Sequence, residues 1–108
     1  MHVDHVDLNN DVIDVCRKHF SWGSAWEDDR ATLHIADGSK FVREAPDNFY
    51  DVIIQDSSDP FTWADDGKVI ELPSNVLYSK EHFHHINKIL FPAGVYNFQA
   101  EVRIFVFY

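Results

Sequence analysis

The chain has 108 residues, of which 45% are hydrophobic and 15% aromatic, a composition typical of a small globular domain. Its net charge of -9 argues against nucleic acid and anionic membranes as partners, because binding to phosphate chains depends on clustered Lys and Arg. The single cysteine, Cys16, excludes an internal disulfide, and no stretch resembles a signal peptide or a bilayer-spanning helix. A cytoplasmic location is therefore expected.

The first part of the chain predicts alternating strands and helices. The expected elements are a strand over 2–8, a helix from Asn9 or Asn10 to about Phe20, a loop over 21–30, a strand over 32–36 and a helix over 39–45. The asparagines suit a helix N-cap, and Pro46 ends the second helix. In the first helix, an apolar stripe that includes Val12, Ile13 and Val15 is expected to be buried.

The run Tyr50–Gln55 is short and apolar and lies between Pro46 and Pro60, which predicts a buried parallel strand. Two carboxylates, Asp56 and Asp59, follow it in a turn-forming Ser/Asp/Pro sequence. Open α/β sheets bind their ligands at the carboxyl ends of the strands. We therefore expect both acids to face one pocket, although a turn capped by Asp and Ser side chains is the alternative.

The rest of the chain continues the alternation. We expect an irregular segment over 61–73 with a hairpin turn at Asp66-Gly67, and then a helix from Ser79 to about Leu90 that buries Phe83, Ile86 and Leu90. A helix stop at 92–94, a strand over 95–99 and a strand-like run over 101–108 are expected to follow. The predicted fold class is α/β with a mainly parallel sheet covered by helices.

Two further acids follow predicted strands. Asp7 lies where nucleotide-binding α/β folds place an acid that accepts both ribose hydroxyls. Asp37 precedes Gly38, and such an acid can bind an adenine amino group where glycine lets the backbone approach. From the residues alone, a turn-forming role is the better interpretation of both acids.

Histidines raise the question of a metal site. His82, His84 and His85 share one predicted helix, but their spacing does not place all three on one face, and no cysteine accompanies them. We expect a solvated helix face and no metal.

The Asp56-Ser57-Ser58-Asp59-Pro60 turn after its strand resembles the signature of the spermidine synthase family, the polyamine aminopropyltransferases. Five blocks between residues 2 and 101 resemble the family in the same order: 6–13, 33–41, 50–60, 73–78 and 97–101. The departures are Asn9 for an acid, Ala36 and Ala100 for glycines, changes at Leu72 and Ser74, and extra residues between Pro60 and Pro73.

The resemblance implies roles for the matching residues. Asp7 binds the ribose of the aminopropyl donor, Asp37 contacts its adenine, Asp56 is the catalytic base and Asp59 binds the diamine. The other substrate-binding positions implied are Gly38, Ser57, Pro73, Gln99 and Glu101.

The implied reaction transfers an aminopropyl group from decarboxylated S-adenosylmethionine to putrescine. The donor carries a sulfonium leaving group, so no metal or further cofactor is expected. The acceptor is a diammonium ion, which acids can attract and one acid must deprotonate before its nitrogen can attack. The implied partners are these small molecules, and a homo-oligomer is left open.

The resemblance also implies an incomplete Rossmann-like fold of the methyltransferase type. Residues 1–108 are expected to be part of a catalytic domain, without the family's N-terminal β-domain, its glycine-rich turn or its C-terminal region. Two alternatives stand beside the transferase: a methyltransferase-like binder of S-adenosylmethionine, and an inactive fragment or regulatory remnant. The sequence does not decide between putrescine and spermidine as acceptor.

Overall fold

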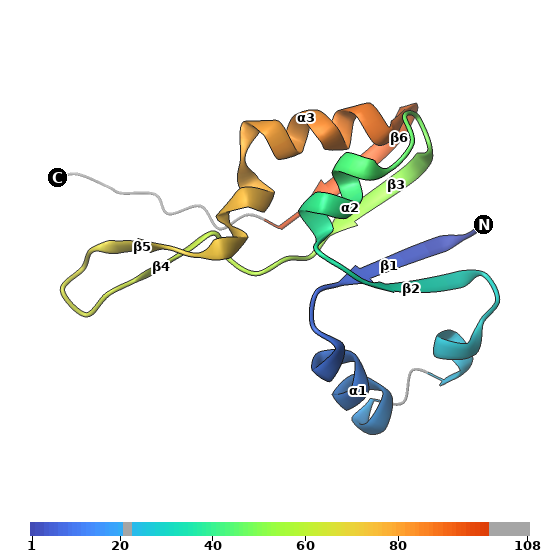
Figure 1. Cartoon of the computed structure of the whole chain (residues 1–108), viewed down its shortest axis with the longest axis horizontal. Coiled ribbons are helices and arrows are strands. Elements are labelled where there is room, and N and C mark those ends of the chain that lie inside the picture. Colours follow the sequence, from blue (N-terminus) through green and yellow to red (C-terminus); the bar gives the residue numbers. More distant parts are fainter. Residues whose placement is uncertain (21–22, 100–108) are drawn as a thin grey trace, which may run out of the picture. The chain divides into compact units, whose positions relative to one another are not determined.

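The computed structural model describes residues 1–20 and 23–99, and the chain divides into two compact units, Met1–Phe41 and Val42–Tyr108 (Figure 1). The elements are, in chain order, β1 (Val3–Asp7), α1 (Asn10–His19), the 3-10 helix η1 (Gly23–Glu27), β2 (Ala31–Ile35), α2 (Gly38–Glu44), β3 (Tyr50–Gln55), β4 (Phe61–Trp63), β5 (Val69–Glu71), the 3-10 helix η2 (Pro73–Tyr78), α3 (Lys80–Ile89) and β6 (Leu90–Phe98). Neither 3-10 helix was predicted. The strand predicted over 101–108 lies outside the described residues, as do Ser21 and Trp22 of the predicted loop.

The first unit is built on a parallel pair of strands, as predicted. β1 and β2 are in register from Val3 opposite Ala31 to Asp7 opposite Ile35. Asn9 caps α1, because its side chain accepts a hydrogen bond of 2.9 Å from the backbone N–H of Asp11. One acid, Asp11, in the first turn of α1 and the basic residues in its last turn complement the helix dipole.

The predicted stripe of α1 is buried at one position only. Ile13 is 2% exposed, whereas Val12 and Val15 are 46% and 53% exposed, so the prediction of a wide buried face is wrong. A two-stranded sheet is too narrow to cover a full helix stripe, which explains the difference.

The second unit contains the central strand. β3 pairs in parallel with β6, and β4 pairs antiparallel with β5 in the predicted hairpin, where Gly67 has a positive φ of 80°. α3 begins after Ser79, whose Oγ accepts a hydrogen bond of 3.1 Å from the backbone N–H of His82.

The start of β6 differs from the prediction. The helix ends at Ile89 and the strand begins at once, so Pro92 and Gly94 lie inside β6 and do not stop a helix. The pairing with β3 changes register between Tyr50 and Val52. Proline, which has no N–H to donate, is accepted in a strand at such an irregularity.

β3 is parallel, as expected, but it is not buried. Val52 and Ile54 are 57% and 72% exposed, because α3 covers only the other face of the pair, where it contacts Gln55 and Tyr96. Parallel strands are buried only when helices cover both faces of the sheet.

The parallel strands form two separate pairs, β2-β1 and β3-β6. Within residues 1–20 and 23–99 neither pair is extended by a third strand, so each of these four strands has one edge without a paired strand. Within these ranges, no helix has the length and hydropathy needed to cross a membrane.

Candidate functional site

Asp7 and Asp37 meet at one edge of the first unit. Asp7 is the last residue of β1, and Asp37 follows the end of the neighbouring parallel strand β2. A hydrogen bond of 2.9 Å from the backbone N–H of Ala36 to the carbonyl oxygen of Asp7 joins the two strand ends. Gly38 opens α2, and a Cβ added there would touch nothing within 4 Å, so the space in front of this backbone is open.

Both acids also stabilise their own turns. Asp7 Oδ1 accepts a hydrogen bond of 2.8 Å from the N–H of Asn9, and Asp37 Oδ1 accepts bonds of 2.8 and 3.2 Å from the N–H groups of Ser39 and Lys40. The turn-forming role predicted for these acids is therefore filled by one carboxylate oxygen of each. The second oxygen of each has no hydrogen bond to any described residue, so it can still accept one from a ligand.

The acids of the second unit behave differently. Asp56 and Asp59 follow the carboxyl end of β3, both side chains are exposed, and neither forms a hydrogen bond or ion pair with a residue that the structure describes. The alternative was a turn capped by Asp and Ser side chains. Neither aspartate caps the turn in the described part of the chain, whereas the Ser57 hydroxyl does form hydrogen bonds, to Gln55 and Tyr78. Two carboxylates three residues apart are thus free to attract a cation.

Other residues hold the backbone of this turn. Ser74 in η2 donates from its Oγ to the carbonyl oxygen of Asp59, and the backbone N–H of Leu72 donates to the carbonyl of Pro60 at 2.9 Å. Tyr78 donates from its hydroxyl to the carbonyl oxygen of Ser58 at 3.2 Å. The predicted contact residue Pro73 is the first residue of η2, next to these anchors.

Gln55 links the turn to the rest of the second unit. Its Oε1 accepts hydrogen bonds of 2.9 Å from His82 Nε2 and from the Tyr96 hydroxyl, and its Nε2 donates bonds of 3.1 Å to Ser57 Oγ and to the carbonyl oxygen of Leu77. Sequence reasoning did not single out this glutamine. A polar side chain at the end of an otherwise apolar strand is the signal that could have found it.

The expectation of a solvated helix face is wrong for His82, which is 4% exposed. It lies four and seven residues before Ile86 and Ile89, the other buried residues of α3, and this helical spacing was visible in the sequence. Burial is the main cause that lowers the pKa of His82 below 6.5, and the nearby His85 adds to it. Burial, with a smaller effect of Tyr78, raises the pKa of the neighbouring Tyr96.

Gln99 lies beside the turn. It follows β6, and its backbone N–H donates a hydrogen bond of 3.3 Å to the carbonyl oxygen of Gln55, although its side chain is exposed. Glu101 lies outside the described residues. In the described part of the chain, no three His, Cys, Asp or Glu side chains gather in a way that could hold a metal ion.

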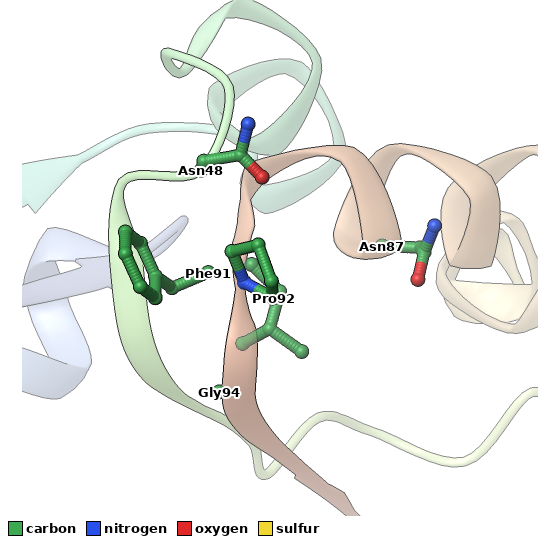
Figure 2. Close-up of a pocket in the computed structure, with 6 residues that line it drawn as sticks. Asn48, Asn87, Phe91, Pro92 and Gly94 are labelled. Atoms are coloured by element: carbon green, nitrogen blue, oxygen red, sulfur yellow. The ribbon is translucent and has the colours of Figure 1, made fainter.

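An open hollow of about 400 Å³ lies at the opposite end of the β3–β6 pair (Figure 2). Its walls come from Asn48, Asn87 and the start of β6, and they include Phe91, Pro92 and Gly94. Leu90, which also lines it, pairs with Tyr50 at the amino end of β3. No predicted site residue lines this hollow, and a pocket shared by Asp56 and Asp59 stays a prediction.

Comparison with known proteins identifies the family of the chain. The sequence model of the spermine/spermidine synthase domain matches residues 1–106. A polyamine aminopropyltransferase of Prochlorococcus marinus (strain MIT 9215) is 37% identical over 101 residues, which are 92% of this chain and 32% of that protein. Putrescine N-methyltransferase 2 of Nicotiana tabacum is 39% identical over 100 residues, which are 92% of this chain and 26% of that protein.

Among solved structures, a spermidine synthase in complex with the transition-state analogue AdoDATO aligns with a TM-score of 0.70 and 30% identity. The alignment covers 88% of this chain and 29% of that one. This likeness, with the parallel strand pairs and flanking helices, confirms the predicted Rossmann-like fold of the methyltransferase type. The chain spans about a third or less of the length of each of these relatives.

Proposed function

The chain belongs to the spermine/spermidine synthase family of transferases, as its five blocks predicted, and from this premise we propose that it acts in aminopropyl transfer to putrescine. The donor in this proposal is decarboxylated S-adenosylmethionine. The observation that carries the proposal is the pair of exposed carboxylates, Asp56 and Asp59, which no described residue engages. Acids that are not used to hold a turn remain available to bind a diammonium ion.

Each side of the reaction has candidate residues. Asp7 and Asp37 bind the ribose and adenine of the donor through the oxygens that their own turns leave free. Gly38 leaves room for the donor beside the backbone. On the acceptor side, Ser57, Pro73 and Gln99 adjoin the turn that carries the two acids, and Glu101 completes the proposed set of substrate contacts.

The chemistry follows from the charges. Asp59 holds one ammonium group of putrescine, and Asp56 takes a proton from the other, which frees a lone pair on that nitrogen. The nitrogen attacks the aminopropyl carbon bound to the sulfonium, the carbon–sulfur bond breaks, and its electron pair leaves with the sulfur as a neutral thioether. The proton stays on Asp56 until solvent removes it. The donor supplies its own leaving group, so the proposal includes no metal and no further cofactor.

Methyl transfer to putrescine is the second candidate, because a putrescine N-methyltransferase is 39% identical to this chain. The two reactions share an acceptor and a sulfonium donor and differ in the carbon that moves. Turnover of putrescine with decarboxylated against ordinary S-adenosylmethionine separates them. We expect product only with the decarboxylated donor; methylated putrescine from the ordinary donor would replace the first proposal by the second.

The base is tested by Asp56→Asn. We expect this variant to lose about 10²-fold or more in kcat, because an amide cannot accept the proton, and to bind the donor as before. Asp51→Asn is the matched control, since Asp51 is an exposed acid near the amino end of β3, the strand that Asp56 follows. Turnover by Asp56→Asn equal to that of the control would refute the assignment.

A third outcome is a chain that turns over neither donor. The regulatory interpretation then requires that the chain forms a complex with a full-length relative or alters its turnover. If neither effect is found, that interpretation also fails. The cytoplasmic location and the absence of nucleic-acid partners stay predictions.

A further inference from the structure

The orientation of the Gln55 carboxamide is fixed by its surroundings. A carboxamide has two donor hydrogens and two acceptor lone pairs, and all four are used here. The carbonyl oxygen of Leu77 can only accept, so the NH₂ group must face it. The Oε1 atom then faces His82 Nε2 and the Tyr96 hydroxyl, and both of these groups must donate.

This orientation defines the state of His82. A histidine that donates from Nε2 carries its proton on that nitrogen when it is neutral, and the lowered pKa of this buried side chain favours the neutral form. Gln55 is thus held on one side by α3 and β6, through His82 and Tyr96. Both of these contacts lie within the second unit.

The other side of the carboxamide reaches the turn. Nε2 donates to Ser57 Oγ, which donates to the Tyr78 hydroxyl at 3.2 Å. That hydroxyl in turn donates to the carbonyl oxygen of Ser58. The chain of hydrogen bonds begins at the residue before Asp56 and ends at the residue before Asp59, and it includes neither carboxylate.

We propose that Gln55 is a positioning residue that sets the geometry of Asp56 and Asp59. The hydrogen bonds from His82 and Tyr96 fix the orientation of its carboxamide. The hydrogen bonds through Ser57 and Tyr78 connect that carboxamide to the backbone of the turn. This inference rests on the proposed function for its effect on turnover. Its effect on the turn itself does not depend on that function.

The variant Gln55→Glu keeps the acceptor side of the carboxamide and removes its donor side. Glutamate has the same shape and still accepts from His82 and Tyr96, so the contacts to α3 and β6 remain. It cannot donate to Ser57 Oγ, and its oxygen repels the carbonyl of Leu77. The Ser57 hydroxyl can bond to the glutamate only by turning its proton away from Tyr78, so the series of hydrogen bonds from residue 55 to the turn is broken in either case. Asn97→Asp is the control, because it adds the same charge at an exposed position of β6, opposite Ile54.

The first measurement is backbone NMR relaxation, which needs no activity. We expect the order parameters of residues 56–59 to fall below about 0.6 in Gln55→Glu while those of α3 stay near about 0.85, and to stay unchanged in Asn97→Asp. Tyr78→Phe removes the last hydroxyl in the same series of hydrogen bonds and is expected to loosen the same residues, which keeps the proposal falsifiable if Gln55→Glu does not fold. Unchanged order parameters at 56–59 in the folded variants would overturn the proposal.

The second measurement is turnover. In a wild-type chain that is active, Gln55→Glu is expected to lower kcat about tenfold to a hundredfold with donor binding unchanged, because a small displacement of a base costs rate and not donor affinity. Normal kcat in Gln55→Glu beside an inactive Asp56→Asn would overturn the positioning role and leave the proposed function intact. An inactive wild-type chain with looser residues 56–59 in Gln55→Glu would instead leave the positioning of the turn intact and remove the proposed function.

Discussion

The four acids of the candidate sites divide into two kinds by what their carboxylates contact. Asp7 and Asp37 each use one oxygen to accept backbone hydrogen bonds, whereas Asp56 and Asp59 make no such bond to a described residue. Removing an acid of the first kind is therefore expected to disturb the fold as well as any ligand. Removing an acid of the second kind is expected to change turnover without changing the stability of the fold. Asp56→Asn therefore tests a catalytic role more directly than a variant of Asp7 or Asp37 would.

The lowered pKa of His82 predicts how the free energy of unfolding depends on pH. Its pKa is lowered in the folded state, so the unfolded chain takes up the proton first as the pH falls below about 6.5. The free energy of unfolding should therefore decrease from pH 7.5 to pH 5.5, by at most about 1.4 kcal/mol per pH unit, the limit for one proton. Urea unfolding at the two pH values measures the change.

The matched variants separate His82 from the other histidines. His82→Gln keeps an N–H donor near Gln55 and is expected to flatten the pH dependence, whereas His84→Gln, on the exposed face of α3, is expected to leave it unchanged. Equal pH dependence in the wild type and in His82→Gln would count against this account.

At the scale of elements, the short loops and caps of the chain were readable, but its packing was not. Asn9 and Ser79 cap the helices that their sequence predicts, and the turn at Gly67 closes the predicted hairpin. The register shift between β3 and β6 follows from contacts between residues 50–52 and 90–95, which local periodicity does not encode. Pro92 was therefore predicted to end a helix, whereas it lies within strand β6.

A substitution at Gly94 can test the close packing of β3 against β6. An added Cβ would lie 2.9 Å from the carbonyl oxygen of Asp51 and 2.8 Å from Leu90 Cδ1, and the backbone oxygen cannot move cheaply. Gly94→Ala is therefore expected to lower the free energy of unfolding by about 1–3 kcal/mol. Gly38→Ala is the control, because its Cβ meets nothing and alanine suits a helix, so its unfolding free energy should stay within about 1 kcal/mol. Equal urea midpoints for the two variants would contradict the close approach.

At the scale of the whole chain, the buried apolar core is small. Among the described residues only Ile13, Ile86 and Ile89 are buried hydrophobic side chains, while apolar residues such as Val52, Ile54 and Val95 stay exposed. A sequence pattern identifies which residues are apolar, but burial depends on what covers them. The prediction of a covered sheet was correct for the fold class and wrong for the exposure of β3.

A core this small predicts a low free energy of unfolding. We expect the polypeptide of these 108 residues to unfold with a free energy below about 5 kcal/mol, because that is the lower end of the range for complete domains. It should also bind a hydrophobic dye such as ANS at the exposed apolar residues of β3 and β6. A sharp urea transition above that free energy, without dye binding, would show that these side chains are covered in solution.

The site could be predicted where a motif specifies it and not where tertiary contacts do. The strand pattern placed Asp7 and Asp37 after two predicted strands, and the structure shows that these strands pair and that their ends meet. Gln55 and His82 each carried a local signal of its position, but the contact between them joins residues 27 apart in the sequence, and no short pattern reveals that contact.

The strand edges that have no partner within residues 1–20 and 23–99 suggest a second role for the acidity of the chain. An open strand edge offers its N–H and C=O groups to any strand of another copy, and such contacts lead to aggregation unless something opposes them. A net charge of -9 makes copies repel one another at neutral pH. Near the isoelectric point of about 5.0 that repulsion vanishes, so mild acid is the condition under which this chain loses its protection against self-association.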